Sequence, residues 1–373
     1  MKLASAEVIP YALPFRRPYV TARGRLDQRE MALLRLRSDD GVVGLGEAVP
    51  LSLRGGATLA TVVRELEALT QLDILDEDAI EAAAPTLSAP ARCAALMALL
   101  DLRSRVGSAD ETGPAATPSG VRLPFLPDSG TNDNRTSEGE AVRCNATLVA
   151  GEPEAVAADA LAWAADGFTT FKLKLGAGDD VAQVRAVREA VGAEVRIRVD
   201  ANGAWDLETA QRALADIEPF GIELAEQPVR SLEEMAELAS LAAIPLAADE
   251  SVASRADAER AASMGACEFT GIKLSKVGGP EDAIAIADVL PAYVSSALDG
   301  PVGIAAAAQV ARTLAASQHP ERLDLAHGLA TQRLFASTVA AVECDLRDGL
   351  LHLPPGPGLG VEIDEDALAA HRL

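Results

Sequence analysis

From Arg143 onward, short strand-like runs alternate with helical stretches, and this alternation constrains the fold more than any other feature of the sequence. The helical stretches are rich in Ala, Glu and Leu, as in Pro153–Ala165 and Leu207–Ile217. Strands that alternate with helices form βαβ units and a parallel sheet. Eight strand-like runs therefore predict an α/β fold with a modified, TIM-like (β/α)8 barrel. The runs are RCNATLV, FKLKL, VRIRVD, IELAEQP, PLAADE, FTGIKL, AYVSSAL and RLDLAHG.

Two further segments flank the predicted barrel, which spans residues 143–343. Residues 1–142 begin with strand-like alternation and a hairpin turn at Asp39-Asp40-Gly41, and continue with a helical region, so they predict an N-terminal α+β capping domain. Within them, the 107–142 stretch is rich in Gly, Pro, Ser, Asp and Asn and is expected to be a flexible loop. Residues 344–373 contain short strands and a PPGPGLG turn, and we expect them to return to the capping domain.

Acidic side chains end three successive strands of the predicted barrel. Asp200, Glu226 and Asp249 follow one another at steps of 26 residues (200 to 226) and 23 residues (226 to 249). The carboxyl ends of barrel strands share one rim, so these side chains should converge. Any one of them alone is better explained as a helix N-cap. Three together would repel each other unless a hard cation held them, which predicts a Mg²⁺ site, with Mn²⁺ as the alternative ion.

Lysine is scarce in this chain, and its positions are therefore informative. Only five of the 33 basic residues are lysine, and four of these lie in FKLKLG and IKLSKVGG. Lysine can be tuned to act as a base, whereas arginine stays protonated. Lys172 and Lys174 share one face of a strand, and Lys172 together with the cation should lower the pKa of Lys174. Lys273, four strands further on, should approach from the opposite side. The alternative is that Lys172 and Lys174 are solvated charges at a strand end.

Composition and charge narrow the range of partners. A net charge of −23 and a pI near 4.6 argue against nucleic acid or an anionic membrane surface. We find no signal peptide and no apolar run long enough to span a bilayer. We therefore expect a cytoplasmic homo-oligomer that binds a small-molecule carboxylate. The cysteines show no CxxC spacing and are expected to be buried and reduced; they are Cys93, Cys144, Cys267 and Cys344.

Over nearly the whole chain, these motifs resemble the muconate lactonising enzyme subgroup of the enolase superfamily. The motifs are the KxK of Lys172/Lys174, the DxN of Asp200/Asn202, EQP at Glu226, ADES at Asp249 and KxxxxGG from Lys273. The resemblance implies removal of a proton α to a carboxylate through an enediolate, with Lys174 and Lys273 as the acid/base pair. It also implies that Lys172 is a supporting charge that tunes Lys174 or touches the substrate carboxylate, and that Asn202 contacts the substrate. The implied Mg²⁺ ligands are Asp200, Glu226 and Asp249.

The positions of the histidines distinguish this subgroup from the mandelate racemase subgroup. The mandelate racemase subgroup would show a His-Asp dyad where Lys273 stands. His327, near the end of the eighth strand, is expected to be a hydrogen-bonded structural residue rather than part of the pocket lining.

The seventh and eighth strands suggest which reaction is catalysed. Ser295-Ser296-Ala297 followed by VGIAA is similar to o-succinylbenzoate synthases. That similarity implies a carbon–oxygen lyase of menaquinone synthesis, which dehydrates 2-succinyl-6-hydroxy-2,4-cyclohexadiene-1-carboxylate. Ser295 and Ser296 would hold the succinyl tail, or would be plain strand-end hydroxyls.

Other activities of the subgroup remain open. N-succinylamino acid racemases share most of these motifs and are the main alternative. Dipeptide epimerases usually carry a DxD where this chain has Ala326-His327-Gly328, which counts against that activity. Muconate cycloisomerisation is a weaker alternative.

Loops of the capping domain are expected to contribute to specificity. Arg16–Arg25 and Pro50–Thr58 are basic and expected to be flexible, and Arg54 is a candidate contact for an anionic substrate. The alternative for any single arginine is an ordinary solvated loop. The alternative from another functional class is a non-catalytic binding protein, which is disfavoured because all five charged catalytic positions are present.

Overall fold

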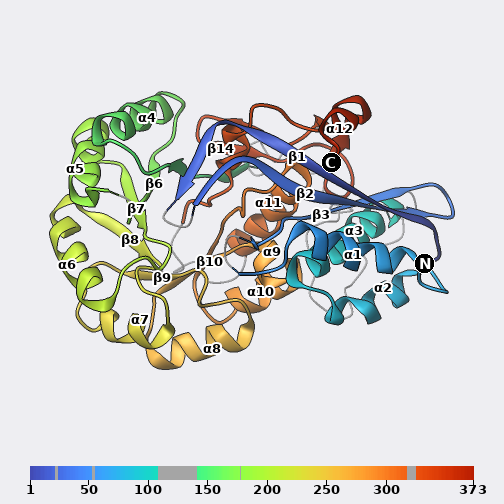
Figure 1. Ribbon diagram of the computed structural model, residues 1–373, viewed down its shortest axis with the longest axis horizontal. Helices are drawn as coiled ribbons and strands as arrows, with labels where there is room; N and C mark the ends of the chain where they lie inside the picture. Colours follow the sequence, from blue (N-terminus) through green and yellow to red (C-terminus); the bar gives the residue numbers. More distant parts are fainter. Residues whose placement is uncertain (22–23, 53–54, 108–140, 177, 317–324) are drawn as a thin grey trace.

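The computed structural model describes residues 1–21, 24–52, 55–107, 141–176, 178–316 and 325–373. Figure 1 shows a ring of strands surrounded by helices and, beside it, a smaller unit of long strands and helices. The predicted α/β class, with a barrel and an N-terminal capping domain, is confirmed.

Seven parallel strands form the barrel sheet, in the order β11-β10-β9-β8-β7-β6-β5. The strand-like run at 326–328 joins its two edges, because His327 bridges Cys144 and Gly328 bridges Ser295, both in parallel. The strands are β5 (Ala146–Leu148), β6 (Thr170–Lys174), β7 (Arg196–Asp200), β8 (Ile222–Glu226), β9 (Leu246–Ala248), β10 (Phe269–Ile272) and β11 (Ala292–Val294).

The helices between these strands cover the outside of the ring (Figure 1). Their starts are encoded locally: Asp206 caps one helix by accepting from Thr209 N at 2.8 Å, and Ser231 forms a capping box with Glu234. Two of them, α4 and α6, have the predicted bounds. The helices are α4 (Pro153–Ala165), α5 (Asp180–Val191), α6 (Leu207–Ile217), η4 (Glu218–Phe220), α7 (Leu232–Ala239), α8 (Arg255–Met264), α9 (Leu274–Val277), α10 (Pro280–Ala287), α11 (Pro301–Ala316) and η5 (Ala330–Leu334).

The capping domain packs helices onto an antiparallel sheet with the order β1-β2-β3. The predicted hairpin turn is confirmed, with Gly41 at φ +85°. Gly46 lets α3 approach the sheet, because a Cβ there would lie 1.9 Å from Ala94 O. The elements are β1 (Leu3–Thr21), β2 (Gly24–Ser38), β3 (Val43–Ala48), α1 (Leu59–Thr70), α2 (Glu77–Ala83), η2 (Ala84–Thr86) and α3 (Ala89–Gly107).

The segment 16–25, predicted to be a basic, flexible loop, is strand over its described residues. Its described residues belong to strands β1 and β2, and past an irregularity between Pro14 and Tyr19 the two strands pair again, with Tyr19 opposite Leu26 and Val20 opposite Arg25. Aromatic packing holds this end of the hairpin, because the ring of Phe15 stacks on those of Tyr19 (5.6 Å) and Phe335 (5.0 Å). The hairpin extends from the capping domain toward the barrel (Figure 1).

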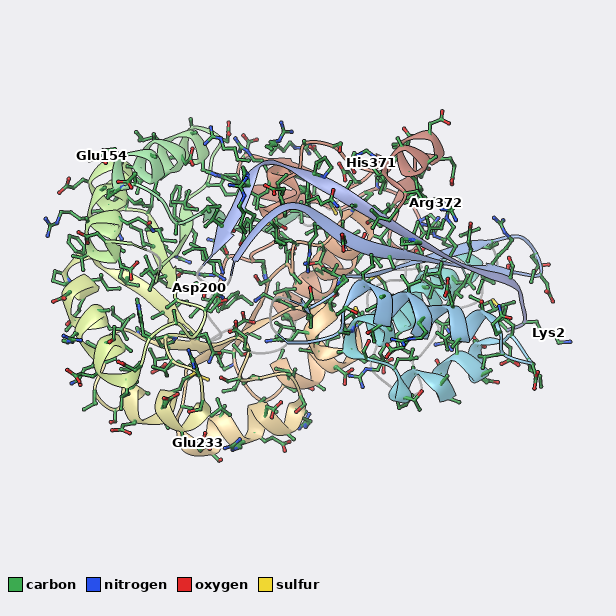
Figure 2. The ribbon with its side chains drawn as sticks, viewed as in Figure 1. Lys2, Glu154, Asp200, Glu233, His371 and Arg372 are labelled. Atoms are coloured by element: carbon green, nitrogen blue, oxygen red, sulfur yellow. The ribbon has the colours of Figure 1, made fainter. Side chains whose placement is uncertain are left out.

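The last part of the chain contacts both units. In it, β14 pairs with β4, which directly precedes the barrel. Arg372 bridges Tyr11 of β1, and Leu373 N donates to Pro10 O at 3.0 Å, so the C-terminus lies beside the capping sheet (Figure 2). The elements are β4 (Ala141–Arg143), β12 (Ala340–Val342), β13 (Asp345–Arg347), β14 (Leu350–His352), β15 (Glu362–Ile363) and α12 (Glu365–His371).

Two further observations concern the cysteines and the lengths of the helices. All four cysteines are buried free thiols. Within the described ranges, no helix combines the length and apolar character needed to cross a membrane.

A buried carboxylate docks the capping domain onto the barrel. Glu47, in β3, accepts from Tyr11 Oη at 2.7 Å and from the backbone N of Gly300 at 2.7 Å, just before α11. Nearby, Arg29 donates to Pro50 O at 2.7 Å and to Ala297 O at 3.0 Å. These contacts fix the loop that follows β11 against the capping sheet.

Replacing Glu47 with glutamine should change how stability depends on pH. Burial, followed by the charge of Asp299, raises the pKa of Glu47 from 4.5 to about 7. The folded state thus binds this proton more tightly, so the contribution to stability is complete below pH 4.5 and is lost as the pH rises through 7. Between pH 4.5 and 8, we expect the free energy of unfolding of the wild type to fall by about 3 kcal/mol more than that of Glu47→Gln. Urea unfolding at both pH values measures this, and identical pH dependence in the two proteins would contradict it.

Candidate active site

The strand register brings the predicted charged residues to one edge of the barrel. Lys174 pairs with Asp200 across β6 and β7, and Asp200 pairs with Glu226 across β7 and β8. Asp249 directly follows β9, and Lys273 directly follows β10. All five are buried, and Figure 2 shows Asp200 inside the ring of strands. The in-register parallel sheet therefore gathers side chains that lie up to 99 residues apart (174 to 273).

Both lysines of FKLKLG point into the barrel. Lys172 Nζ lies 2.6 Å from Glu226 Oε2 and 2.9 Å from Asp200 Oδ2. Lys174 Nζ lies 2.5 Å from Asp200 Oδ2 and donates to Asn202 Oδ1 at 3.0 Å. The exposed fractions of the two lysines are 4% and 6%, which excludes solvated charges at a strand end.

The opposite side of the rim holds a second lysine cluster. Lys273 Nζ forms an ion pair with Asp249 Oδ2. Lys276 Nζ lies 3.1 Å from Asp249 Oδ1 and also donates to Gly271 O at 3.1 Å. The sequence interpretation gave Lys276 no role, although the scarcity of lysine was a signal that could have found it.

The three carboxylates are close enough to influence one another. Burial, followed by the charges of Asp200 and Asp249, raises the pKa of Glu226 although Lys172 opposes this change. Burial and the charge of Asp249 raise the pKa of Asp200, but the charges of Lys172 and Lys174 outweigh them. The pKa of Asp200 is therefore held below its ordinary value. The acidic cluster is thus tolerated inside the barrel because lysines offset its charge.

The protein's own groups raise the pKa of Lys174, whereas the predicted lowering included a bound cation as well as Lys172. Burial lowers it most and the charge of Lys172 lowers it further, but Asp200, Tyr19 and Glu226 together outweigh these effects and raise the pKa above its ordinary value. A cation bound by Asp200 and Glu226 would offset two of the charges that raise this pKa, which would favour the lowering effects of burial and Lys172. For Lys172, burial is likewise outweighed by Asp200 and Glu226, which raise its pKa, so this side chain stays charged.

The acidic cluster offers a donor set that suits a hard divalent cation. Its donors are carboxylate oxygens, which Mg²⁺ prefers. Within the described part of the chain, Glu226 Oε1 is buried without a hydrogen-bond partner. Among the described residues, no group of three acidic, His or Cys side chains is arranged to hold a metal ion as it stands. An oxygen of each of the three carboxylates instead faces a lysine. The residues present therefore fit a metal that would compete with lysines for these oxygens.

Gln227 organises the strand ends, although the sequence interpretation assigned only its neighbour in EQP. Its Oε1 accepts from the backbone N of Asp249 at 2.8 Å and of Ser251 at 3.2 Å, and its Nε2 donates to Val229 O at 2.9 Å. Its backbone O accepts from Gly203 N at 2.7 Å. Gln227 thus ties together the loops that follow β7, β8 and β9.

The two serines at the end of the seventh strand, Ser295 and Ser296, have different surroundings. Ser296 Oγ donates to Asp299 Oδ2 at 2.7 Å and accepts from Asp299 N at 2.8 Å, so its hydroxyl is used within the turn before α11. Ser295 is buried and faces Gly328, where a Cβ would lie 2.6 Å from Ser295 Oγ. Of the two, Ser295 remains the better candidate for a substrate contact. Arg54 lies outside the described residues.

His327 has the structural role expected for it. Its Nδ1 accepts from Val294 N at 3.0 Å, next to the bridge that joins the barrel edges. Burial, Arg198 and Arg143 lower the pKa of His327 to about 3, which keeps it neutral. The end of the eighth strand, Ala326-His327-Gly328, therefore presents no charge to a substrate.

Comparison with known proteins gives matches over both units of the fold. Residues 4–109 match the family model for the mandelate racemase/muconate lactonizing enzyme N-terminal domain, and residues 155–367 match the model for the enolase C-terminal domain-like family. An o-succinylbenzoate synthase from Thermobifida fusca (strain YX) is 38% identical over 207 residues, which cover 54% of this chain and 62% of the synthase.

Other similar proteins carry different activities. A hydrophobic dipeptide epimerase from Enterococcus faecalis (strain ATCC 700802 / V583) is 30% identical over 380 residues, covering 97% of this chain and 99% of the epimerase. A crystal structure of dipeptide epimerase from E. faecalis V583, complexed with Mg and the dipeptide L-Leu-L-Tyr, superposes with a TM-score of 0.82. It is 28% identical and covers 97% of this chain and 100% of its own.

Proposed function

The chain belongs to the mandelate racemase/muconate lactonizing enzyme family of the enolase superfamily, and on this premise we propose that it removes a proton α to the carboxylate of a small acid. One observation carries the proposal: Lys174 and Lys273 are buried at the ends of β6 and β10, beside the acidic cluster. Four steps separate these strands around a ring of eight, so the two ammonium groups face a substrate from opposite sides.

In this proposal, Asp200, Glu226 and Asp249 hold Mg²⁺, with Mn²⁺ as the alternative ion. When bound, the ion supplies Lewis-acid stabilisation of the negative charge that develops on the substrate carboxylate. Lys172, which stays charged, adds a fixed positive charge on the same side. Burial of all these groups excludes water, which strengthens each interaction.

Lys174 acts as the base in its neutral form. Its Nζ takes the α proton, while Asn202 Oδ1, 3.0 Å away, orients the amine. Gln183 Nε2 donates to Lys174 O at 2.9 Å and fixes the end of the strand. In a dehydration, Lys174 returns this proton to the departing hydroxyl, a C=C bond forms and water leaves. Lys273 offsets the developing charge from the opposite face.

The most specific form of the proposal is dehydration of 2-succinyl-6-hydroxy-2,4-cyclohexadiene-1-carboxylate to o-succinylbenzoate, a carbon–oxygen lyase reaction of menaquinone synthesis. The similarity to the T. fusca synthase supports it. The uncharged eighth strand end also supports it, because Ala326-His327-Gly328 offers no carboxylate to a substrate ammonium group.

Epimerisation or racemisation is the second candidate, since the similarity to a dipeptide epimerase extends over 97% of the chain. Two lysines on opposite faces also suit removal of a proton from one face and its return to the other. The eighth strand end offers no carboxylate to a substrate ammonium group. N-succinylamino acids have no free ammonium group, so they are the better substrates within this candidate.

Parallel assays separate these candidates. We expect Mg²⁺-dependent dehydration of the cyclohexadiene carboxylate, followed by ultraviolet absorbance, to disappear with EDTA and in Lys174→Ala. N-succinylamino acid racemisation and dipeptide epimerisation are measured beside it. Racemisation or epimerisation without dehydration would move the substrate to the second candidate. No exchange of any α proton with solvent would favour a non-catalytic binding protein.

A further inference from the structure

We infer that Tyr293, supported by Arg198, is a positioning residue that aims one carboxylate oxygen of Glu226 at the metal. This inference rests on the proposed function, in which Glu226 is a metal ligand. It concerns two side chains below the rim of the barrel that no sequence motif identified. Their contacts with Glu226, with each other and with the barrel interior support the inference.

Tyr293 holds one oxygen of Glu226 and leaves the other free. The phenol Oη of Tyr293, in β11, donates to Glu226 Oε2. Lys172 Nζ lies 2.6 Å from the same oxygen. Among the described residues, Glu226 Oε1 has no hydrogen-bond partner although it is buried. Two donors on Oε2 fix the rotation of the carboxylate and so determine where Oε1 points.

Arg198 holds the ring of Tyr293 in place. Its guanidinium carbon lies 5.0 Å from the centre of that ring, in a cation–π arrangement. The guanidinium is fixed in turn by an ion pair with Glu223 and by a 2.7 Å hydrogen bond to Ala326 O. Arg198 lies two residues before Asp200 in β7, so both side chains project from the same face of the strand. The pair thus forms a layer directly below the acidic cluster.

The barrel interior is shaped around the Tyr293 ring. Gly271 of β10 stands opposite Tyr293 in the register, and a Cβ on it would lie 3.1 Å from Tyr293 Oη. A side chain at 271 would therefore press on the phenol. The remaining neighbours form an apolar layer that leaves the ring little room to move, and they are Leu224, Ala247, Phe269 and Leu325.

A second buried tyrosine–glutamate pair provides the matched comparison. Tyr11 Oη donates to Glu47 Oε2 at 2.7 Å, and both residues are buried. In that pair the other oxygen, Glu47 Oε1, accepts a hydrogen bond from Gly300 N at 2.7 Å. Both oxygens of Glu47 thus form hydrogen bonds, and these dock the two domains. The pair at Tyr293 differs because it leaves one oxygen of its carboxylate available.

The test measures metal binding directly in the full-length protein. Isothermal titration with Mn²⁺ is applied to the wild type, Tyr293→Phe, Gly271→Ala, Tyr11→Phe and Glu226→Gln, each checked for folding by circular dichroism. We expect Tyr293→Phe to raise the Kd for Mn²⁺ by about 10- to 100-fold, the range typical when a group that orients a ligand is lost. Gly271→Ala should raise it in the same direction, because it displaces the phenol without deleting it. Tyr11→Phe should leave the Kd unchanged.

The outcomes separate the inference from the function on which it rests. Mn²⁺ binding by the wild type that is lost in Glu226→Gln supports the proposed ligand. If the Kd of Tyr293→Phe then equals that of the wild type, the positioning role is wrong and the proposed function stands. An equal loss of affinity in Tyr293→Phe and Tyr11→Phe would also overturn it, since it would reflect general loosening. A wild type that binds no Mn²⁺ would overturn both.

Discussion

Replacing Lys174 with alanine should reduce turnover by about 10³-fold or more while the protein stays folded. A positioned general base contributes roughly 10²–10⁴-fold to rate, and in this proposal Lys174 both removes and returns the proton. Folding should survive because Asp200 keeps Lys172 as a partner at 2.9 Å. Turnover is followed by ultraviolet absorbance, and exchange of the α proton is followed by NMR in D₂O.

Lys273→Ala, in contrast, should distinguish the two candidate reactions. If the reaction is a dehydration, Lys174 alone transfers the proton. Lys273→Ala then removes only the stabilisation of the negative charge on the intermediate, and turnover slows. In a racemase it should abolish racemisation, while Lys174 still exchanges the α proton of one enantiomer with solvent. Exchange confined to one enantiomer in each lysine variant would therefore establish two-base chemistry.

Lys2→Ala is the natural control, since Lys2 is the one lysine of the sequence outside FKLKLG and IKLSKVGG. Figure 2 shows it at the far end of the capping domain from Asp200. We expect wild-type turnover in this variant. Full activity in Lys174→Ala would contradict the assignment of the base, whichever substrate is turned over.

The barrel and its rim could be predicted because their signals are local. Alternation with period two placed Lys172 and Lys174 on one face, and the regular spacing of strand ends placed Asp200 and Glu226 on one edge. Caps such as Asp206 mark helix starts within a few residues, and α6 begins at the predicted residue.

The layer beneath the rim could not be predicted, because its contacts are non-local. Tyr293 reaches Glu226 across 67 residues, and Arg198 reaches Ala326 across 128. In the sequence, Tyr293 belongs to an ordinary strand-like run, and nothing local indicates that its hydroxyl meets a carboxylate. The effect of the protein's own charges on the pKa of Lys174 could not be predicted for a related reason. It depends on the relative distances to Asp200 and Lys172, which a sequence does not contain.

Among the substitutions proposed here, removing Asp249 should reduce stability most, because the buried Lys273 and the partly buried Lys276 share this carboxylate. Lys273 contacts one of its oxygens and Lys276 lies 3.1 Å from the other. Asp249→Asn leaves both ammonium groups, one buried and one partly buried, without that charge. Breaking a buried pair in this way costs about 3–5 kcal/mol of unfolding free energy, and loss of a proposed ligand should also abolish Mn²⁺ binding. Urea unfolding and calorimetric titration measure the two effects separately.

The double variant Asp249→Asn/Lys276→Met separates charge balance from metal ligation. The three side chains at positions 249, 273 and 276 carry a net charge of +1 in the wild type, from one carboxylate and two ammonium groups. The double variant has the same net charge, because only the ammonium group of Lys273 remains. We expect at least half of the lost stability to return, because one uncompensated charge is gone. Mn²⁺ binding should not return, because a lysine substitution cannot replace a carboxylate oxygen. Recovery of both would mean that Asp249 serves only to neutralise lysines, and the metal site would then have to be built from Asp200 and Glu226 without it.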